Sequence, residues 1–406
     1  MSKSVARSLT VVLCLIAVYV ADTVATHAVF TSRFPGANDF YSRWAGARAW
    51  WVQGLSPYSE EASRQIEIGI FGRRALPGED PGPFAYPFYA VFLIAPLAFL
   101  PYVWAEAAWL ALLQFALIGG ILGSIRLVEW HIPPLLLGVT LISMVFFYHS
   151  ARAILLGQFA VIVFALVAGM LLALQARRDL WAGVLLALAT IKPQMVFLLV
   201  PLALLWAIAT RRWRLVWGFA GAMAVLCGAS WIAVPGWLGD FLTQMMRYSS
   251  YTAIGSPVWV ITRYFFPALG APGEIGLSLV LAGWALVTWL RLWRTPSWPM
   301  FLWTVSFTLI VTNLIALRTA TTNYVVLFIP LIHLLAVMQT RWPRGGTWAV
   351  IGIEAVLLVG LWALFLATVK NKFEHPIMYL PLPVGLWIAW VAACRGLGGE
   401  MKIEGG

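Results

Sequence analysis

Residues 182–214 read "AGVLLALATIKPQMVFLLVPLALLWAIATRRWR", an apolar run that ends in an arginine cluster. The apolar segment extends over residues 180–209 and is the wrong length for an ordinary transmembrane helix. As one straight helix it would be about 45 Å long, too long for one crossing of a hydrocarbon core of about 30 Å and too short for two. Because proline breaks helices, Pro193 predicts the tip of a helical hairpin that turns back within the bilayer.

The composition of the whole chain is that of an integral membrane protein. Hydrophobic residues make up 62% of the 406 residues and charged residues 11%, against about 25% charged residues in soluble domains. Apolar runs recur along nearly the whole length and leave no room for a separate soluble domain. We therefore predict an all-α polytopic membrane protein in which residues 1–406 form a single membrane domain.

The hydropathy pattern predicts about 12 transmembrane helices. The first, residues 8–30, follows Lys3 and Arg7 and is expected to be an uncleaved signal anchor. Residues 86–100 are short and rich in proline, so we expect a re-entrant or interfacial helix there rather than a crossing. The other expected apolar segments are 102–125, 132–149, 153–176, 180–209, 215–235, 257–267, 274–293, 299–317, 321–340, 347–369 and 376–394.

The distribution of Lys and Arg orients these segments, because short cytoplasmic loops collect positive charge. Arginine clusters at 177–178, 211–214, 291–294 and 341–344 are therefore expected on the cytoplasmic side of the cell inner membrane, with both termini inside. The extracytoplasmic side then receives residues 31–85, 150–157, the Lys192 tip, 236–273, 318–323 and 370–375. Polar residues that could carry chemistry gather on that face.

Several classes of function are disfavoured by the same sequence. The net charge is +11, but the 27 Lys and Arg are scattered between apolar runs, so no nucleic-acid partner is expected. Motifs for nucleotide binding are absent, and the five histidines show no metal-ligand spacing. We predict neither a metal nor a cofactor. Energy for a reaction would have to come from a substrate already in the membrane.

The loop of residues 31–85 is the longest polar connection, and its juxtamembrane helices carry the sharpest catalytic candidate, Asp39. Asp39 begins the stretch "DFYSRWAGARAWWVQGLSPYS", residues 39–59. A structural alternative is that Asn38 or Asp39 caps a helix and that Asp39 pairs with Arg43 one turn later.

Lys192 is the second candidate, because a charge inside the membrane is costly and is often functional. Its alternative is a lysine that extends to the membrane surface. Other polar residues expected on the outer face could contact lipid headgroups or substrate. They are Arg152, Gln158, Arg318, Asn323 and Tyr324.

Four motifs together resemble a known family. They are residues 39–59, "FAYPFYAVFLIAPLAFLP" at 84–101, "GQFAVIVFAL" at 157–166, and residues 182–214. In order and spacing they are similar to the polyprenol-phosphate-mannose-dependent α-mannosyltransferases, which include the mycobacterial phosphatidylinositol mannoside mannosyltransferases. The sequence departs from that pattern at "YPF", residues 86–88, where the family has "YPP".

The resemblance implies a GT-C-like fold, a membrane glycosyltransferase with its active site on the extracytoplasmic side, and transfer from a polyprenyl-phosphate sugar to a glycolipid or glycan acceptor. Asp39 would be the catalytic base, and Lys192 matches the family's lysine in "KPQ". With Arg152 and Arg318, Lys192 would bind the donor phosphate. Further implied contacts are Arg43 and Arg48 near the lipid headgroup, and Tyr58, which would fix the return of the loop.

Two rival functions remain open at the level of sequence. A lipid-linked sugar flippase or small-molecule transporter would also be polytopic and basic, with broken helices near the midplane. A lipid-linked oligosaccharide ligase or polymerase would be expected to carry a larger outer loop. The concentration of polar residues on one face favours a surface active site.

Overall fold

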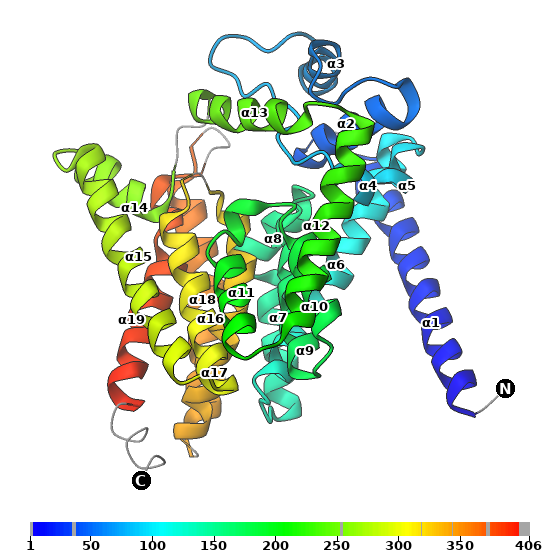
Figure 1. The fold of residues 1–406 in the computed structure, drawn as a ribbon. Coiled ribbons are helices and arrows are strands. Elements are labelled where there is room, and N and C mark those ends of the chain that lie inside the picture. The colour runs from blue at the N-terminus through cyan, green and yellow to red at the C-terminus, as the bar shows by residue number, and fades with distance from the viewer. Residues whose placement is uncertain are drawn as a thin grey trace. The chain divides into compact units, whose positions relative to one another are not determined.

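The structure is a computed structural model that describes residues 3–34, 38–251, 255–317, 319–342, 344–370 and 374–397. Its regular elements in these ranges are helices (Figure 1). The chain forms two compact units, the first made of residues 1–117, 154–158 and 226–252, and the second of 118–153, 159–225 and 253–406.

The first unit contains the long apolar helix α1 and several shorter helices. Its elements are α1 (Lys3–Thr26), a π-helix (His27–Thr31), α2 (Asp39–Gln53), α3 (Glu60–Phe71), α4 (Ala90–Leu93), α5 (Ala95–Ala98), the first part of α6 (Tyr102–Leu127) and α13 (Trp237–Tyr251). Hydrogen bonds from side chains of α2 to backbone carbonyls hold α2 against α4 and α5. Trp44 Nε1 donates to Leu97 O at 3.0 Å and Trp51 Nε1 to Val91 O at 3.1 Å.

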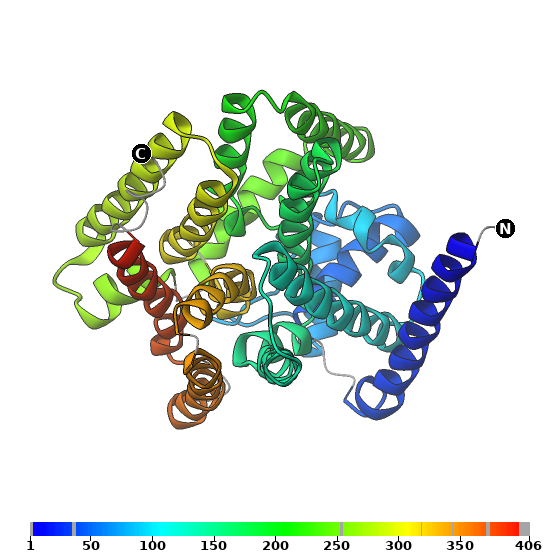
Figure 2. The same ribbon diagram turned by 90° about the horizontal axis from the view of Figure 1, so that it is seen from below.

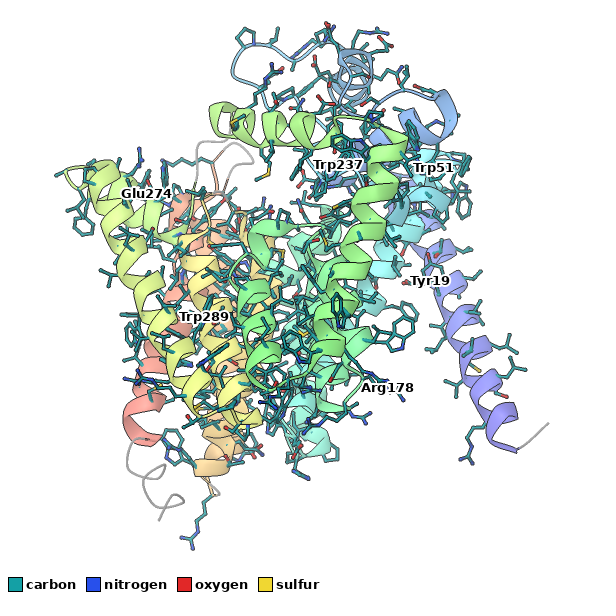
Figure 3. The ribbon with its side chains drawn as sticks, viewed as in Figure 1. Tyr19, Trp51, Arg178, Trp237, Glu274 and Trp289 are labelled. Atoms are coloured by element: carbon teal, nitrogen blue, oxygen red, sulfur yellow. The ribbon has the colours of Figure 1, made fainter. Side chains whose placement is uncertain are left out.

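Helix α1 makes few contacts with the rest of the protein, as expected for an apolar helix surrounded by lipid. None of its apolar window is buried in the protein. One anchor in the middle of the helix is Tyr19, whose hydroxyl donates to Ala108 O of α6 at 3.0 Å (Figure 3).

The second unit is a bundle of long and half-length helices (Figures 1 and 2). Its α-helices are α7 (Pro134–Phe146), α8 (Tyr148–Leu155), α9 (Ala160–Gln175), α10 (Asp179–Ala189), α11 (Leu199–Ala209), α12 (Trp213–Ala233), α14 (Pro257–Trp259), α15 (Gly270–Arg294), α16 (Trp298–Ile315), α17 (Phe328–Arg341), α18 (Gly346–Thr368) and α19 (Pro381–Leu397). The other helical elements are 3₁₀ helices at Pro193–Met195, Thr321–Leu327 and Pro376–Tyr379 and a π-helix at Val260–Phe265. Helices α8 and α12 end in the first unit.

The core of the second unit is built around α16, which packs against α11, α15, α17 and α19. Nearly every side chain of its stretch 301–314 is buried. Stacked aromatic rings join α16 to its neighbours. The ring centres of Trp206 in α11 and Phe301 are 4.1 Å apart, and those of Trp390 in α19 and Phe307 are 4.0 Å apart.

The predicted number of about 12 crossings is wrong. In the described part of the chain, eight helical segments are long and apolar enough to cross a membrane, or nine if α7 and α8, bent by 51°, form one span. Helix α9 is only 16 residues long, and the expected segment 257–267 is a three-residue helix followed by a π-helix. Residues 86–100 fold as α4 and α5, each four residues long, so they form no span, as expected.

A break between two short helices lies where the hairpin within residues 180–209 is predicted, and the turn within the bilayer stays a prediction. Helix α10 ends at Ala189 and α11 begins at Leu199, with Pro193–Met195 between them. Each helix has 11 residues, or about 16 Å, roughly half of the hydrocarbon thickness.

Two glycines let α10 lie directly on α12. A Cβ atom at Gly183 would meet Leu215 O at 2.2 Å, and one at Gly218 would meet Leu180 O at the same distance. Small residues at such crossings allow close packing of helices in membranes. The half-length helix α10 is therefore held by backbone contact with a longer neighbour.

Candidate active site

Asn38 and Asp39 start helix α2 and have different environments. Asn38 Oδ1 accepts a hydrogen bond from Phe40 N at 2.9 Å, so Asn38 is the cap of the helix. Asp39 stands in the first turn and is exposed. A negative charge is favourable at this end of a helix, but the capping role that could have explained Asp39 belongs to its neighbour.

The Asp39 carboxylate is oriented by a buried amide. Gln158 Nε2 donates to Asp39 Oδ2, and Gln158 Oε1 accepts from Arg43 at 3.5 Å. Arg43 also donates to Tyr86 Oη at 2.7 Å and lies 4.8 Å from the centre of that ring. Because Arg43 and Gln158 are only 8% and 5% exposed, the exposed carboxylate rests on a buried polar support.

Contacts from α6 and the end of α8 fix Asn38. Asn38 Nδ2 donates to Glu106 Oε1 at 2.7 Å and to Leu155 O at 3.0 Å, and Asn38 Oδ1 accepts from Tyr102 Oη at 3.1 Å. Glu106 is 1% exposed. The position of Asp39 is therefore set by a side-chain network that joins residues far apart in the sequence.

Gly157 brings Gln158 close to α2. Its φ is +63°, a backbone conformation that glycine adopts without strain. A Cβ atom there would lie 2.5 Å from Cβ of Phe40. The carbonyl of Gly157 accepts a hydrogen bond from Trp109 Nε1 at 2.9 Å, which anchors the turn.

Tyr58 closes the first loop in the manner expected for the "GLSPY" turn. Its hydroxyl donates to Tyr86 O at 2.6 Å. Burial, with smaller contributions from the charges of Asp240 and Tyr89, raises the pKa of Tyr58, so the hydroxyl stays protonated and keeps this bond. Tyr58 thereby fixes the backbone of Tyr86, whose hydroxyl accepts the hydrogen bond from Arg43.

Asp80 adds a second carboxylate to the electrostatic environment of Asp39. Partial burial and the negative charge of Asp39 raise the pKa of Asp80, while the N–H of Gly82 and the charge of Arg43 act in the opposite direction. Arg48 uses one nitrogen of its guanidinium group in the fold, because Nη1 donates to Ala98 O at 2.9 Å.

A second polar cluster lies in the second unit. Glu374 forms an ion pair with Arg152 and accepts hydrogen bonds from the hydroxyls of Tyr148 and Thr321. Arg152 also donates to Tyr148 Oη at 3.0 Å. The Glu374 side chain is 8% exposed and that of Arg152 25%, so the arginine is the more accessible partner.

The segment expected as an outer loop at Asn323 and Tyr324 is instead a buried 3₁₀ helix, Thr321–Leu327. Asn323 donates to Thr319 Oγ1 at 3.0 Å, and Tyr324 donates to Tyr379 O at 3.1 Å. The buried ring of His149 packs edge-on against Tyr324, with ring centres 5.1 Å apart. Arg318, the third residue expected there, lies outside the described residues.

Lys192 occupies the break between α10 and α11, directly before Pro193, and is 4% exposed. That burial is unlike a lysine that extends to the membrane surface. Its φ of −128° and ψ of 76° lie outside the helical region, which a residue before proline avoids.

The described part of the chain contains no group of three or more His, Cys, Asp or Glu side chains placed to hold a metal ion. The sequence-based prediction of no metal stays a prediction.

Comparison with known proteins assigns the chain to a family. The profile of glycosyltransferase family 87 matches residues 84–312, more than half of the chain. The chain belongs to glycosyltransferase family 87. No curated protein and no solved structure matches this family 87 glycosyltransferase. The matched region contains Tyr86, Arg152, Gln158 and Lys192, and Asp39 precedes it.

Sequence reasoning missed several residues of this glycosyltransferase that contact the predicted ones or their neighbours. Examples are Glu106 beside Asn38, Tyr148 and Glu374 beside Arg152, and His149 beside Tyr324. Glu106 had a signal, because a carboxylate within an apolar span is costly and needs a partner. Glu374 was part of an expected outer loop, but nothing in the sequence pairs it with Arg152, 222 positions earlier.

Proposed function

We propose that this membrane glycosyltransferase transfers a sugar, mannose by its family resemblance, from a polyprenyl phosphate to a lipid-linked or glycan acceptor on the extracytoplasmic face. Family 87 is a GT-C-type polyprenyl-phosphate-dependent mannosyltransferase family. Asp39 acts as the general base, and the configuration at the anomeric carbon inverts.

The reaction needs one base and no general acid. The acceptor oxygen attacks the anomeric carbon, its proton passes to Asp39, and the bond from that carbon to the phosphate oxygen breaks with its electron pair on the phosphate. A lipid phosphate, with a second pKa of about 6, leaves as a stable anion. One carboxylate therefore replaces the pair that glycosidases use.

The observation that carries this proposal is the exposed Asp39 carboxylate on its buried Gln158–Arg43 support. An exposed carboxylate can reach an acceptor hydroxyl, and a fixed hydrogen bond from Gln158 holds its orientation. A base held in one position avoids the loss of rate that misplacement causes.

Cations of the second unit would stabilise the phosphate. The candidates that the structure describes are Arg152 and Lys192, and Arg318 remains a candidate from the sequence alone. Negative charge that grows on the leaving phosphate is stabilised by fixed positive groups. Arg152 is already paired with Glu374, so donor phosphate would compete with that carboxylate. Gln158, Asn323 and Tyr324 remain proposed substrate contacts, as do Arg43 and Arg48.

The direct test is transfer of radiolabelled mannose from polyprenyl phosphate to a glycolipid extract by protein purified in detergent, with and without EDTA. We expect transfer that a chelator does not affect, and an α-linked product from a β-linked donor. Transfer in detergent separates an enzyme from a flippase, because a flippase needs a sealed membrane. Movement of lipid-linked sugar across vesicles without any transfer would contradict the proposal.

A further inference from the structure

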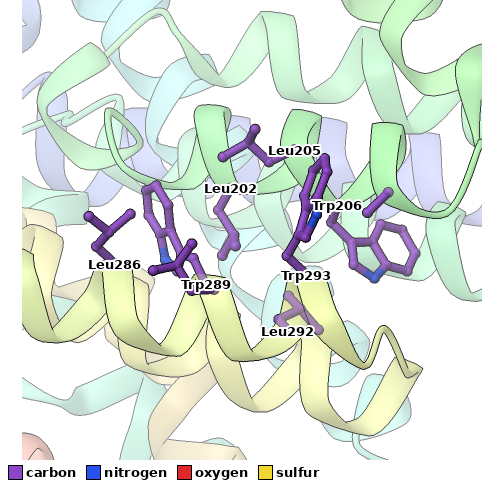
Figure 4. Close-up of a pocket in the computed structure, with 9 residues that line it drawn as sticks. Leu202, Leu205, Trp206, Leu286, Trp289, Leu292 and Trp293 are labelled. Atoms are coloured by element: carbon purple, nitrogen blue, oxygen red, sulfur yellow. The ribbon is translucent and has the colours of Figure 1, made fainter.

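An apolar groove lies between α11 and α15 of the second unit (Figure 4). It has a volume of about 250 Å³ and no charged lining residue. Leu205, Leu286 and Leu290 are 40–52% exposed, so the groove opens to the outside of the helix bundle. The lining residues are Leu202, Leu205, Trp206, Ala209, Leu286, Trp289, Leu290, Leu292 and Trp293.

The groove has a defined direction. Leu202 lies with Leu286 toward one end, and Trp206 with Trp293 toward the other, so the two helices run the same way (Figure 4). The Trp293 end is the carboxyl end of α15, and Glu274 lies near its opposite end (Figure 3). The groove therefore belongs to one half of the membrane.

Exposed arginines follow both helices at this end. Arg211 follows α11, Arg214 stands in the first turn of α12, and Arg291 and Arg294 occupy the last turn of α15. All four are exposed. Residues 210–218 and 287–300 contain no acidic residue, and the carboxylate of Asp179 is paired with the buried Arg212. The positive-inside rule assigns this end to the cytoplasmic surface.

The indole N–H groups of Trp206 and Trp289 are not open to a ligand in the groove. Trp206 is 5% exposed, and its Nε1 is itself buried, without a hydrogen-bond acceptor among the residues that the structure describes. Trp289 Nε1 donates to Thr308 Oγ1 at 2.9 Å. These two rings therefore offer a ligand apolar surface, which suits an acyl chain.

We infer that this groove binds an anionic phospholipid of the cytoplasmic leaflet. An acyl chain lies between α11 and α15, and the phosphate lies by the arginines. Basic pockets between transmembrane helices on the cytoplasmic side suit anionic headgroups. The site is separate from the proposed chemistry, which takes place at the extracytoplasmic face.

The test is lipid binding by the full-length protein in a neutral detergent, measured by native mass spectrometry and by the shift in melting temperature. Phosphatidylglycerol is the probe, and phosphatidylcholine with the same acyl chains is the neutral comparison. We expect one saturable phosphatidylglycerol molecule that raises the melting temperature, and no equivalent effect of phosphatidylcholine.

Variants separate the two parts of the site. The double variant Arg211→Gln/Arg294→Gln should weaken phosphatidylglycerol roughly thirty-fold, since each surface arginine contributes about a factor of five toward anionic lipid. Arg263→Gln is the matched control. Arg263 forms an ion pair with Glu274 near the other end of α15, so its loss should leave phosphatidylglycerol binding unchanged. Leu290→Trp, at an exposed position, should fill the groove and abolish saturable binding.

Three results would overturn the inference. One is equal binding of phosphatidylcholine, which would mean an unselective acyl-chain groove. Another is unchanged phosphatidylglycerol affinity in the arginine variant, whose surface substitutions leave the core intact. The third is displacement of phosphatidylglycerol by a polyprenyl phosphate in a manner that Leu290→Trp removes, which would make the groove a donor site.

Discussion

Asn38 and Asp39 divide the work at the start of α2. Asn38 caps the helix and is held by Glu106, whereas Asp39 projects an exposed carboxylate that Gln158 orients. The sequence led to Asp39 through its place in the first loop. It could not predict Gln158 as the partner of Asp39, because the two residues are 119 positions apart.

Gln158→Leu should lower kcat by about 10- to 100-fold with little change in donor KM, because the Asp39 carboxylate loses the hydrogen bond that orients it. Steady-state kinetics with varied donor would measure this. The conservative variant Gln158→Asn serves as a comparison for packing. An unchanged kcat in Gln158→Leu would show that orientation of Asp39 does not depend on this amide.

Glu374→Gln should lower the donor KM, because it removes the carboxylate that competes with phosphate for Arg152. Arg152→Gln should raise the donor KM by roughly tenfold, the effect of losing one charged hydrogen bond. Kinetics at saturating acceptor would give both values, and melting temperatures would show whether the ion pair also supports the fold. A donor KM that moves in the same direction in both variants would oppose phosphate binding at Arg152.

At the scale of elements, the sequence predicted where helices break better than where they span. Pro193 predicted the turn between α10 and α11, and the prolines of residues 86–100 predicted short helices. The count of crossings failed because hydropathy marks apolar segments without giving their helical length. The sequence predicts an outer loop at 318–323, but Thr321–Leu327 form a buried 3₁₀ helix in which Thr321 donates to Glu374, a contact that the sequence does not display.

Gly183→Ala should destabilise the protein by about 1–3 kcal/mol, because the added methyl group would clash with the backbone of α12. Gly221→Ala on α12 is the matched control, with nothing within 4 Å of the added atom. Melting temperatures of the two purified variants would compare them. Equal melting temperatures would refute direct backbone packing of α10 on α12.

At the scale of the whole molecule, composition and charge predicted a multi-pass helical membrane protein, and family membership makes it a glycosyltransferase. The candidate residues divide between the two compact units: Asp39 with its support belongs to the first, and Arg152 and Lys192 belong to the second. The motifs contain Asp39, Gln158 and Lys192 but not Arg152, which is predicted only as a polar residue of the outer face. They could not give the hydrogen-bond partners, which come from packing of distant segments.

The hairpin makes a prediction about topology that labelling can test. Cysteines introduced at Arg178 and Arg211, on either side of the α10–α11 pair, should both react with an impermeant thiol reagent only from the cytoplasmic side. A cysteine at Ser59 in the first loop should react from the opposite side. Labelling of positions 178 and 211 from opposite sides would mean that the pair crosses the membrane once.

The central claim is that Asp39 takes the proton of the acceptor. It is tested most directly by single-turnover transfer from a polyprenyl-phosphate sugar with Asp39→Asn, beside Glu60→Gln as a control in the same loop, where the Glu60 side chain is 89% exposed. The account predicts that Asp39→Asn folds and binds donor but loses at least about a hundredfold in rate, as expected for loss of a general base, while Glu60→Gln retains activity. Transfer by Asp39→Asn at the unmodified rate would contradict it.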